Sequence, residues 1–63
     1  MIGSRIRTAR NKAKISQQKL ADKIAISKSR LGRIERGELS PTLEEIHIIS
    51  AEVNVSIGDL LES

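Results

Sequence analysis

The chain of 63 residues contains no cysteine, phenylalanine, tyrosine or tryptophan, and Pro41 is its single proline. Without cysteine, neither a disulfide framework nor a thiolate metal site can form, and this absence fits a reducing compartment. The longest apolar runs have three residues, as in 24–26, which is too short for a membrane span or a signal-peptide core. We therefore expect a cytoplasmic protein without a membrane-spanning segment.

The length and the lack of catalytic patterns restrict the kind of protein further. Sixty-three residues correspond to one domain, 1–63, which buries only about 60% of the surface exposed by the unfolded chain. The single histidine, His47, has no cysteine or second histidine with which to build a metal site. Because glycine-rich phosphate loops and nucleophile–base patterns are also missing, we expect no enzyme, no cofactor and no small-molecule substrate.

The basic residues are confined to the first part of the chain. All eleven Lys and Arg lie between Arg5 and Arg36, and with two acidic residues they give residues 1–37 a formal charge of +9. Residues 38–63 carry six acidic residues and no base, a formal charge of −6. This asymmetry indicates a polyanionic partner for the first part. The alternative is that the basic side chains only form solvated helix faces.

The missing aromatic residues narrow the choice of polyanion. Proteins that bind RNA or single strands usually stack bases on aromatic rings, and this chain has none. A membrane surface is a weaker candidate, because no basic segment carries a bulky apolar face with aromatic anchors. Double-stranded DNA is therefore the favoured partner.

The spacing of apolar residues predicts an all-α fold, a compact bundle of five short helices. The first helix is expected from about 3 to 12. We expect Ser16 and Ser27 to cap the second and third helices, and Gly37 to end the third in the left-handed conformation. The apolar residues expected to face inward on these three helices are Ile2, Ile6, Ala9, Ala13, Leu20, Ala21, Ile24, Leu31 and Ile34.

The fourth and fifth helices also carry start and stop signals. Thr42 and Glu45 form a capping-box pattern after Pro41, and Asn54 stands where a left-handed residue would end the fourth helix. Ser56 is the expected cap of the fifth, and Asp59 three residues on could complete a second box. The apolar residues expected to face inward on these helices are Leu43, Ile46, Ile49, Val53, Ile57, Leu60 and Leu61.

The segment 16–37 contains two helices joined by only Ala25-Ile26-Ser27. Helices with so short a connection cross at a steep angle. When Leu31 and Ile34 face inward, the other face of the third helix has only basic, small or polar side chains, so it can enter the major groove of B-DNA. The residues of this face are Lys28, Ser29, Gly32, Arg33 and Arg36.

At these positions the sequence resembles the λ-repressor-like helix-turn-helix domains of phage repressors, Cro proteins and many small bacterial regulators. The resemblance covers essentially the whole chain. The matching residues are Arg5-Ile6-Arg7, Arg10, Ile15-Ser16-Gln17, Leu20-Ala21, Ile26-Ser27, Leu31, Ile34-Glu35-Arg36-Gly37, Pro41-Thr42-Leu43 and Val55-Ser56.

The resemblance implies a sequence-specific DNA-binding domain of a transcriptional regulator, in the first place a repressor, from a bacterium, an archaeon or a phage. The recognition helix, about 27–36, would lie in the major groove, and Arg33 would contact guanine O6 and N7, worth about 1–3 kcal/mol of discrimination. The implied base-reading residues are Lys28, Ser29 and Arg33. The implied phosphate contacts are Arg10, Gln17, Ser27, Arg30, Arg36 and Thr42.

The resemblance also implies a partly buried salt bridge between Arg10 and Glu35. Three positions, Ala25, Gly32 and Ile48, depart from the pattern. Ala25 stands where the turn usually has glycine, and a left-handed alanine costs about 1 kcal/mol. Gly32 lies inside the recognition helix, where glycine costs up to about 1 kcal/mol against alanine, and Ile48 lies where similar domains have polar residues. Separately, Glu38 is a poor residue for the loop that the resemblance places against phosphate.

Apolar residues near the fourth and fifth helices raise the question of self-association. Ile48 is expected on the outer side of the fourth helix, where similar domains have polar residues. The expected dimer-interface residues are Ile48, Ile57 and Leu60, although a lone exposed isoleucine needs no such explanation. A homodimer would imply a pseudo-palindromic operator with half-sites about 10 base pairs, or a multiple of that, apart.

A second hypothesis is a protein-interaction module of the same fold, such as an antitoxin or a bridging factor. The apolar Ile48 and the acidic second half of the chain favour it.

Overall fold

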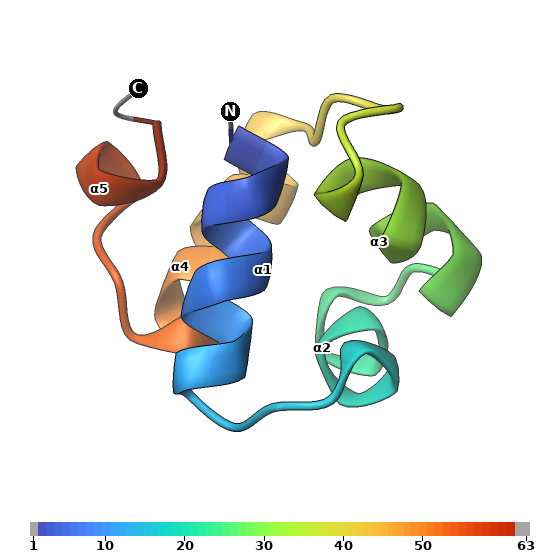
Figure 1. Ribbon diagram of the computed structural model, residues 1–63, viewed down its shortest axis with the longest axis horizontal. Helices are drawn as coiled ribbons and strands as arrows, with labels where there is room; N and C mark the ends of the chain where they lie inside the picture. Colours follow the sequence, from blue (N-terminus) through green and yellow to red (C-terminus); the bar gives the residue numbers. More distant parts are fainter. Residues whose placement is uncertain (1, 62–63) are drawn as a thin grey trace.

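The computed structural model describes residues 2–61, which fold into five α-helices (Figure 1). The described residues include no strand, so the expected all-α fold is confirmed. None of these helices is long and apolar enough to cross a membrane. The helices are α1 (Ile2–Lys12), α2 (Gln17–Ile24), α3 (Lys28–Glu35), α4 (Leu43–Val53) and α5 (Ile57–Leu61).

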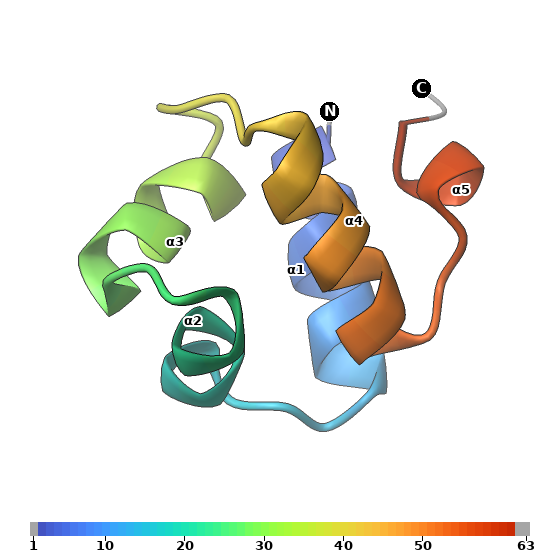
Figure 2. The same ribbon diagram turned by 180° about the vertical axis from the view of Figure 1, so that it is seen from behind.

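Helices α1 and α4 pack together in the middle of the molecule, with α2 and α3 on one side and α5 on the other (Figures 1 and 2). Helix α1 also packs against α3 and α5, and α2 packs against α3 and α4. The α2–α3 pair is therefore braced from behind by the two central helices, while the opposite face of α3 stays open.

The core consists of aliphatic side chains from all five helices, because the chain has no aromatic residue. Burial of this apolar surface stabilises the fold by about 25 cal/mol per Å². The side chains that are almost completely buried are Ile6, Leu20, Leu31, Ile34, Ile49 and Leu60.

The start signals of the helices form as the sequence predicts. The hydroxyl oxygens of Ser16 and Ser27 each accept a backbone N–H bond of 3.0 Å from three residues on. In the capping box, Glu45 N–H donates to Thr42 Oγ1 over 3.1 Å, and Thr42 N–H donates to Glu45 Oε1 over 2.8 Å. Ser56 Oγ accepts from Asp59 N–H over 3.1 Å.

Four described residues at or just beyond helix ends have left-handed backbones, among them Lys14 (φ 59°) after α1. Gly37 (φ 81°) and Asn54 (φ 61°) do so where the sequence predicts it. Ala25 (φ 63°) adopts the same conformation after α2, so the turn keeps the geometry that usually requires glycine. Because Ala25 has a Cβ, this turn carries local strain.

Gly3 lets α1 approach the end of α3 closely, a role that the sequence analysis did not assign. Gly3 is buried, and a Cβ at this position would overlap the carbonyl oxygen of Ile34 and lie 2.9 Å from that of Glu35. The absence of a side chain at Gly3 therefore sets the distance between the two helices.

Three of the inward placements expected from the sequence are wrong. Leu43 is 71% exposed, because it opens α4 on the side away from the core. Leu61 is also exposed, since consecutive helical residues point in different directions and Leu60 takes the inward position. Ala13 is exposed because α1 ends at Lys12, one residue earlier.

Candidate nucleic-acid interface

A buried ion pair connects α1 with α3. Arg10 Nε donates to Glu35 Oε2 over 2.7 Å and Arg10 Nη2 donates to Glu35 Oε1 over 3.1 Å. The two side chains are only 11% and 3% exposed. The pair that the resemblance implied is therefore present, in the two-pronged geometry typical of strong Arg–carboxylate contacts.

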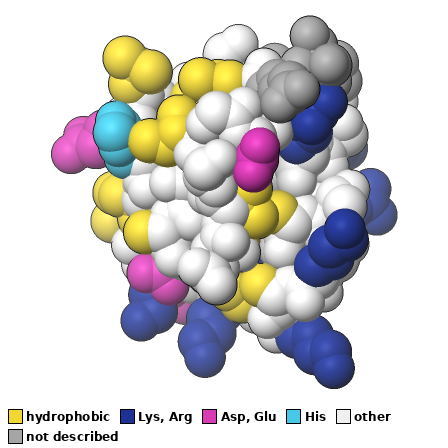
Figure 3. Space-filling view, turned by 90° about the vertical axis from the view of Figure 1, so that its left-hand side faces the viewer, with side chains coloured by type: hydrophobic (Ala, Val, Ile, Leu, Met, Phe, Trp, Pro, Cys, Tyr) yellow, Lys and Arg dark blue, Asp and Glu magenta, His cyan; other side chains and the backbone are white. Residues whose placement is uncertain are grey.

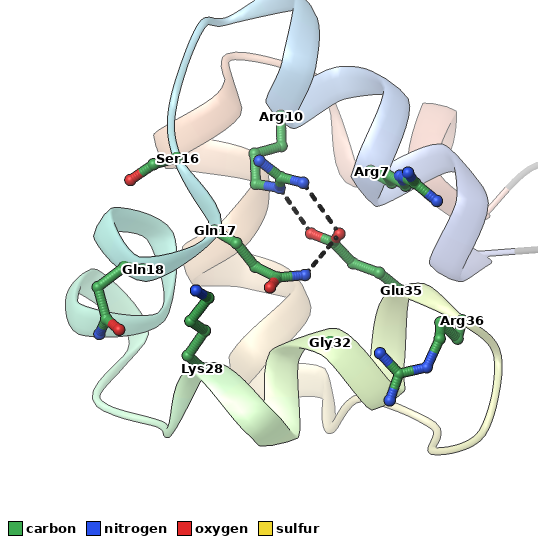
Figure 4. A pocket seen from close by; sticks show the side chains of 9 residues that line it. All are labelled: Arg7, Arg10, Ser16, Gln17, Gln18, Lys28, Gly32, Glu35 and Arg36. Atoms are coloured by element: carbon green, nitrogen blue, oxygen red, sulfur yellow. Dashed lines mark hydrogen bonds and ion pairs between the residues drawn. The ribbon is translucent and has the colours of Figure 1, made fainter.

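Two further bonds extend this pair to the following loop and to α2. Arg10 Nη1 donates to the carbonyl oxygen of Ile15 over 2.9 Å. Gln17 Nε2 donates to Glu35 Oε1 over 3.2 Å (Figure 4). Arg10 and Glu35 thus hold α1, α2 and α3 in a fixed arrangement.

An open pocket of about 540 Å³ lies over this network, between α1, α2 and α3 (Figure 4). Its charged lining consists of four cationic side chains and Glu35, and the charge of Glu35 is compensated by Arg10. The pocket is therefore electropositive and suits an anion. The lining residues are Arg7, Arg10, Ser16, Gln17, Gln18, Lys28, Gly32, Glu35 and Arg36.

The N-terminus of α2 opens into the same pocket. The N–H groups of Lys19 and Leu20 bond to Ser16, whereas those of Gln17 and Gln18 have no acceptor among the described residues. Free N–H groups and the helix dipole favour an anion at this position. Gln17 therefore stands where the resemblance places a phosphate contact.

The three predicted base-reading residues, Lys28, Ser29 and Arg33, are all exposed on α3. Lys28 also lines the pocket. The Arg33 side chain is 51% exposed, and its Nε lies 3.6 Å from Glu38 Oε1. This face of α3 is thus accessible and cationic, as the sequence predicts.

Arg30 is less accessible than the sequence analysis expected. Arg30 Nε and Nη2 donate to Glu45 Oε2 and Oε1 over 3.0 and 3.1 Å. These hydrogen bonds and the opposite charge raise the pKa of Arg30, and the bond from Arg30 lowers the pKa of Glu45 although burial opposes this. The pair joins α3 to the start of α4. Arg30 therefore binds Glu45 within the fold, whereas we expected it to contact only solvent or phosphate.

The other predicted phosphate contacts, Arg36, Ser27 and Thr42, differ in which hydrogen-bond donors remain free to contact an anion. Arg36 is exposed and its Nε donates to Glu38 Oε2 over 2.9 Å. Ser27 and Thr42 serve as helix caps, and the N–H of Thr42 is already bound to Glu45. A hydroxyl that accepts a bond keeps its own hydrogen, so both residues can still donate a hydroxyl bond to an anion, and for Thr42 the hydroxyl is the only donor left.

The sequence of the chain matches the helix-turn-helix family over residues 6–60. The chain belongs to the helix-turn-helix family. It is 36% identical over 63 residues to the HTH-type transcriptional regulator SinR of Bacillus subtilis, a match that covers 98% of this chain and 57% of that protein. The chain spans about half the length of the curated relatives it matches, from 42% to 57%.

Two solved structures of helix-turn-helix proteins superpose closely on the chain. SinR in complex with DNA gives a TM-score of 0.89 at 36% identity, covering 98% of this chain and 100% of that one. The P22 c2 repressor in complex with a synthetic operator gives a TM-score of 0.89 at 32% identity, covering 98% and 94%.

The structure adds Arg7 to the residues expected on this helix-turn-helix surface. Arg7 lines the pocket one turn before Arg10, a position that the i, i+3 spacing could have indicated. Gly32, which the sequence already places on the open face of α3, forms part of the pocket lining. A Cβ on Gly32 would lie 3.1 Å from Arg36 Nη1 and 3.6 Å from Gln17 Nε2, so the missing side chain keeps the pocket deep.

The surface over α4 and α5 differs from the one expected for self-association. Leu60 is only 1% exposed and belongs to the core, so its placement at a dimer interface is wrong. Ile48 and Ile57 are half-buried and pack against the core. On the face seen in Figure 3, hydrophobic side chains gather beside the single histidine, and most Lys and Arg side chains lie toward the opposite edge and the bottom.

Proposed function

We propose that this chain is the sequence-specific double-stranded-DNA-binding domain of a transcriptional regulator, and that it acts as a repressor. The observation that carries the proposal is the electropositive pocket beside the exposed cationic face of α3. The two features adjoin, since Lys28 belongs to the exposed face of α3 and also lines the pocket. The structures of SinR and of the P22 c2 repressor with DNA support it.

In this proposal the pocket holds backbone phosphate and α3 reads bases. The phosphate-contacting residues are Arg7, Gln17, Ser27, Arg36 and Thr42, with Arg10 and Arg30 contributing charge from paired positions. Lys28, Ser29 and Arg33 face the base edges, and Arg33 alone can reach guanine O6 and N7 with a fork of two donors. Phosphate contacts fix the position of the domain, and base contacts give the sequence preference.

Two copies of the domain are proposed to bind a pseudo-palindromic operator as a homodimer, in the cytoplasm. The half-sites would be about 10 base pairs, or a multiple of that, apart. The corrected interface candidates are the partly buried Ile48 and Ile57 together with the exposed Leu61.

Selection of bound sites from a random duplex library tests the proposal. A preferred sequence should emerge from the library. The affinity of the protein for that sequence should fall steeply with added salt, because each neutralised phosphate makes the slope of log K against log salt more negative by about 0.9. Arg33→Ala should relax the preference, whereas Gln17→Ala should weaken binding to all sequences alike. A library that returns no preferred sequence would contradict the proposal.

A second candidate function is a protein-interaction module of the same fold. The observation that favours it is that the SinR protein is also found in a complex with the SinI protein, and this chain exposes Leu43 and Leu61. A heparin column and a mobility shift with random duplex DNA separate the two candidates. Little retention in both assays would favour the interaction module.

A further inference from the structure

Glu38 contacts two of the exposed arginines that the proposed function places against DNA, Arg33 and Arg36. Glu38 Oε1 lies 3.6 Å from Arg33 Nε, and Glu38 Oε2 accepts a 2.9 Å bond from Arg36 Nε. All three side chains are about half exposed. One carboxylate therefore forms ion pairs with two guanidinium groups at the edge of the exposed cationic face of α3.

The backbone places Glu38 firmly at this position. Its N–H donates to the carbonyl oxygen of Arg33 over 2.8 Å, and the N–H of Gly37 donates to that of Ile34 over 3.1 Å. With the left-handed Gly37, these bonds form the Schellman motif that ends α3. The carboxylate is thus attached to the end of the recognition helix.

The geometry of the two contacts leaves the ends of both guanidinium groups available. Glu38 meets each arginine at Nε, and the Nη groups of Arg33 and Arg36 have no hydrogen-bond acceptor among the described residues. The two Nη groups of an arginine can still bind guanine O6 and N7 end-on. A carboxylate at Nε therefore restricts the orientations of Arg33 without occupying its base-reading end.

The charge of Glu38 acts differently on phosphate. A negative group at this surface opposes binding to the DNA backbone, which supplies essentially all of the affinity for non-specific sequences. Removing one such charge should raise the non-specific affinity by up to about eightfold in 0.1 M salt, the factor given by the release of 0.9 counterion per charge.

We propose that Glu38 is a specificity-determining residue that positions Arg33 for base contact and weakens binding to non-specific DNA. The inference rests on the proposed function, since it concerns the same surface. Glu38 acts through Arg33 and through its charge, so both effects together set the ratio between the affinities for the preferred and for a random sequence.

The test compares Glu38→Gln with Glu52→Gln, which makes the same charge change in the last turn of α4, far from the loop that carries Glu38 (Figure 2). Dissociation constants are measured for the library-selected duplex and for a random duplex of equal length. Glu38→Gln should raise the random-duplex affinity several-fold without a matching gain on the selected duplex, so the ratio falls. Glu52→Gln should leave the ratio unchanged.

Two further variants separate positioning from charge. Glu38→Asp keeps the charge but shortens the reach, so it should leave the random-duplex affinity near that of the parent protein and weaken binding to the selected duplex. In an Arg33→Ala background, Glu38→Gln should lose its effect on sequence preference and keep its effect on the random duplex.

The outcomes also distinguish this inference from the proposed function. If the parent protein selects a sequence but Glu38→Gln and Glu52→Gln give the same ratio, the role of Glu38 is wrong and DNA binding stands. If the parent protein selects no sequence, the proposed function itself fails.

Discussion

Arg10 and Glu35 form a two-pronged ion pair at the junction of three helices, 25 positions apart in the sequence and shielded from solvent. The bond from Arg10 to Ile15 connects this pair to the loop after α1, and the bond from Gln17 to Glu35 connects it to α2. A buried pair is costly to break, because the remaining partner stays in the interior without a counter-charge. The pair is therefore the point at which the fold and the candidate interface depend on each other.

Glu35→Gln should lower the free energy of unfolding by about 3–5 kcal/mol, the usual cost of removing one partner of a buried pair. Urea denaturation at neutral pH measures this change. The double variant Arg10→Met/Glu35→Leu leaves no uncompensated charge, so it should be less destabilised than Glu35→Gln. A double variant that is at least as unstable as the single one would show that the buried charge is not the cause.

Gly3→Ala should destabilise the fold by about 1–3 kcal/mol or more, because the added methyl group overlaps backbone of α3 that cannot move independently. Thermal unfolding followed by circular dichroism measures the effect. Gly58→Ala is the matched control, since its Cβ would meet only Ser56 Oγ, at 3.9 Å. The control should be neutral or stabilised, and equal effects of the two variants would contradict the close α1–α3 contact.

Gly32→Ala should separate stability from DNA affinity. Alanine in a helix interior is favoured over glycine by up to about 1 kcal/mol, and the new Cβ crowds only the flexible ends of Arg36 and Gln17. The variant should therefore unfold at an equal or higher temperature but bind duplex DNA more weakly, because the pocket becomes shallower. Unchanged affinity in a titration with labelled duplex would show that DNA does not use the pocket.

Ala25→Gly should stabilise the protein by about 0.5–1 kcal/mol, since glycine adopts the left-handed conformation of this turn without strain. The greater freedom of glycine in the unfolded chain removes part of the gain. Ala51→Gly, at an exposed position inside α4, should instead destabilise by about 1 kcal/mol. Denaturation midpoints that move in the same direction for both variants would contradict the strain at Ala25.

The Arg30–Glu45 pair predicts how stability changes in acid. The bond from Arg30 lowers the pKa of Glu45 in the folded protein, whereas an unfolded glutamate has a pKa of about 4.3. Between these two values the unfolded chain binds more protons, so the free energy of unfolding rises with pH. The stabilisation should be fully present above pH 4.3 and be lost as the pH falls through the lowered value.

Urea denaturation between pH 2.5 and 6, a range chosen to span the ordinary carboxyl pKa of about 4, measures this dependence. The free energy of unfolding of Glu45→Gln should depend less on pH than that of the parent protein over the acidic part of the range. Glu44→Gln, at the neighbouring exposed position, is the control and should keep the parent slope. If Glu45→Gln also keeps it, the pair does not contribute to acid stability.

The features that could be predicted from the sequence are the local ones. Ser16, Ser27 and the Thr42–Glu45 box each act within three residues, so their partners are fixed by helix geometry. The inward face of a helix is also a local property, and it failed only near helix ends, at residues such as Leu43 and Leu61, where the period no longer constrains the direction.

The long-range contacts could not be derived from residue spacing. Arg10 and Glu35 were paired through the resemblance alone, and nothing in the pattern indicated that Arg30 reaches Glu45 or that Gly3 touches the end of α3. Such contacts depend on how the helices cross, which a single sequence encodes only in the sum of many side chains. The position of Glu38 beside Arg33 and Arg36 belongs to the same class.

The network around Arg10 means that α3 cannot tilt or slide without moving α1 and α2 with it. Helices α1, α2 and α3 then move as one rigid body, so in the proposed complex the duplex would have to change its shape to fit the protein. Sequences that twist or bend easily would be bound more tightly even where no side chain touches a base. If the chain binds DNA as proposed, the stiffness of this small domain is a second source of selectivity, expressed in the mechanics of the DNA.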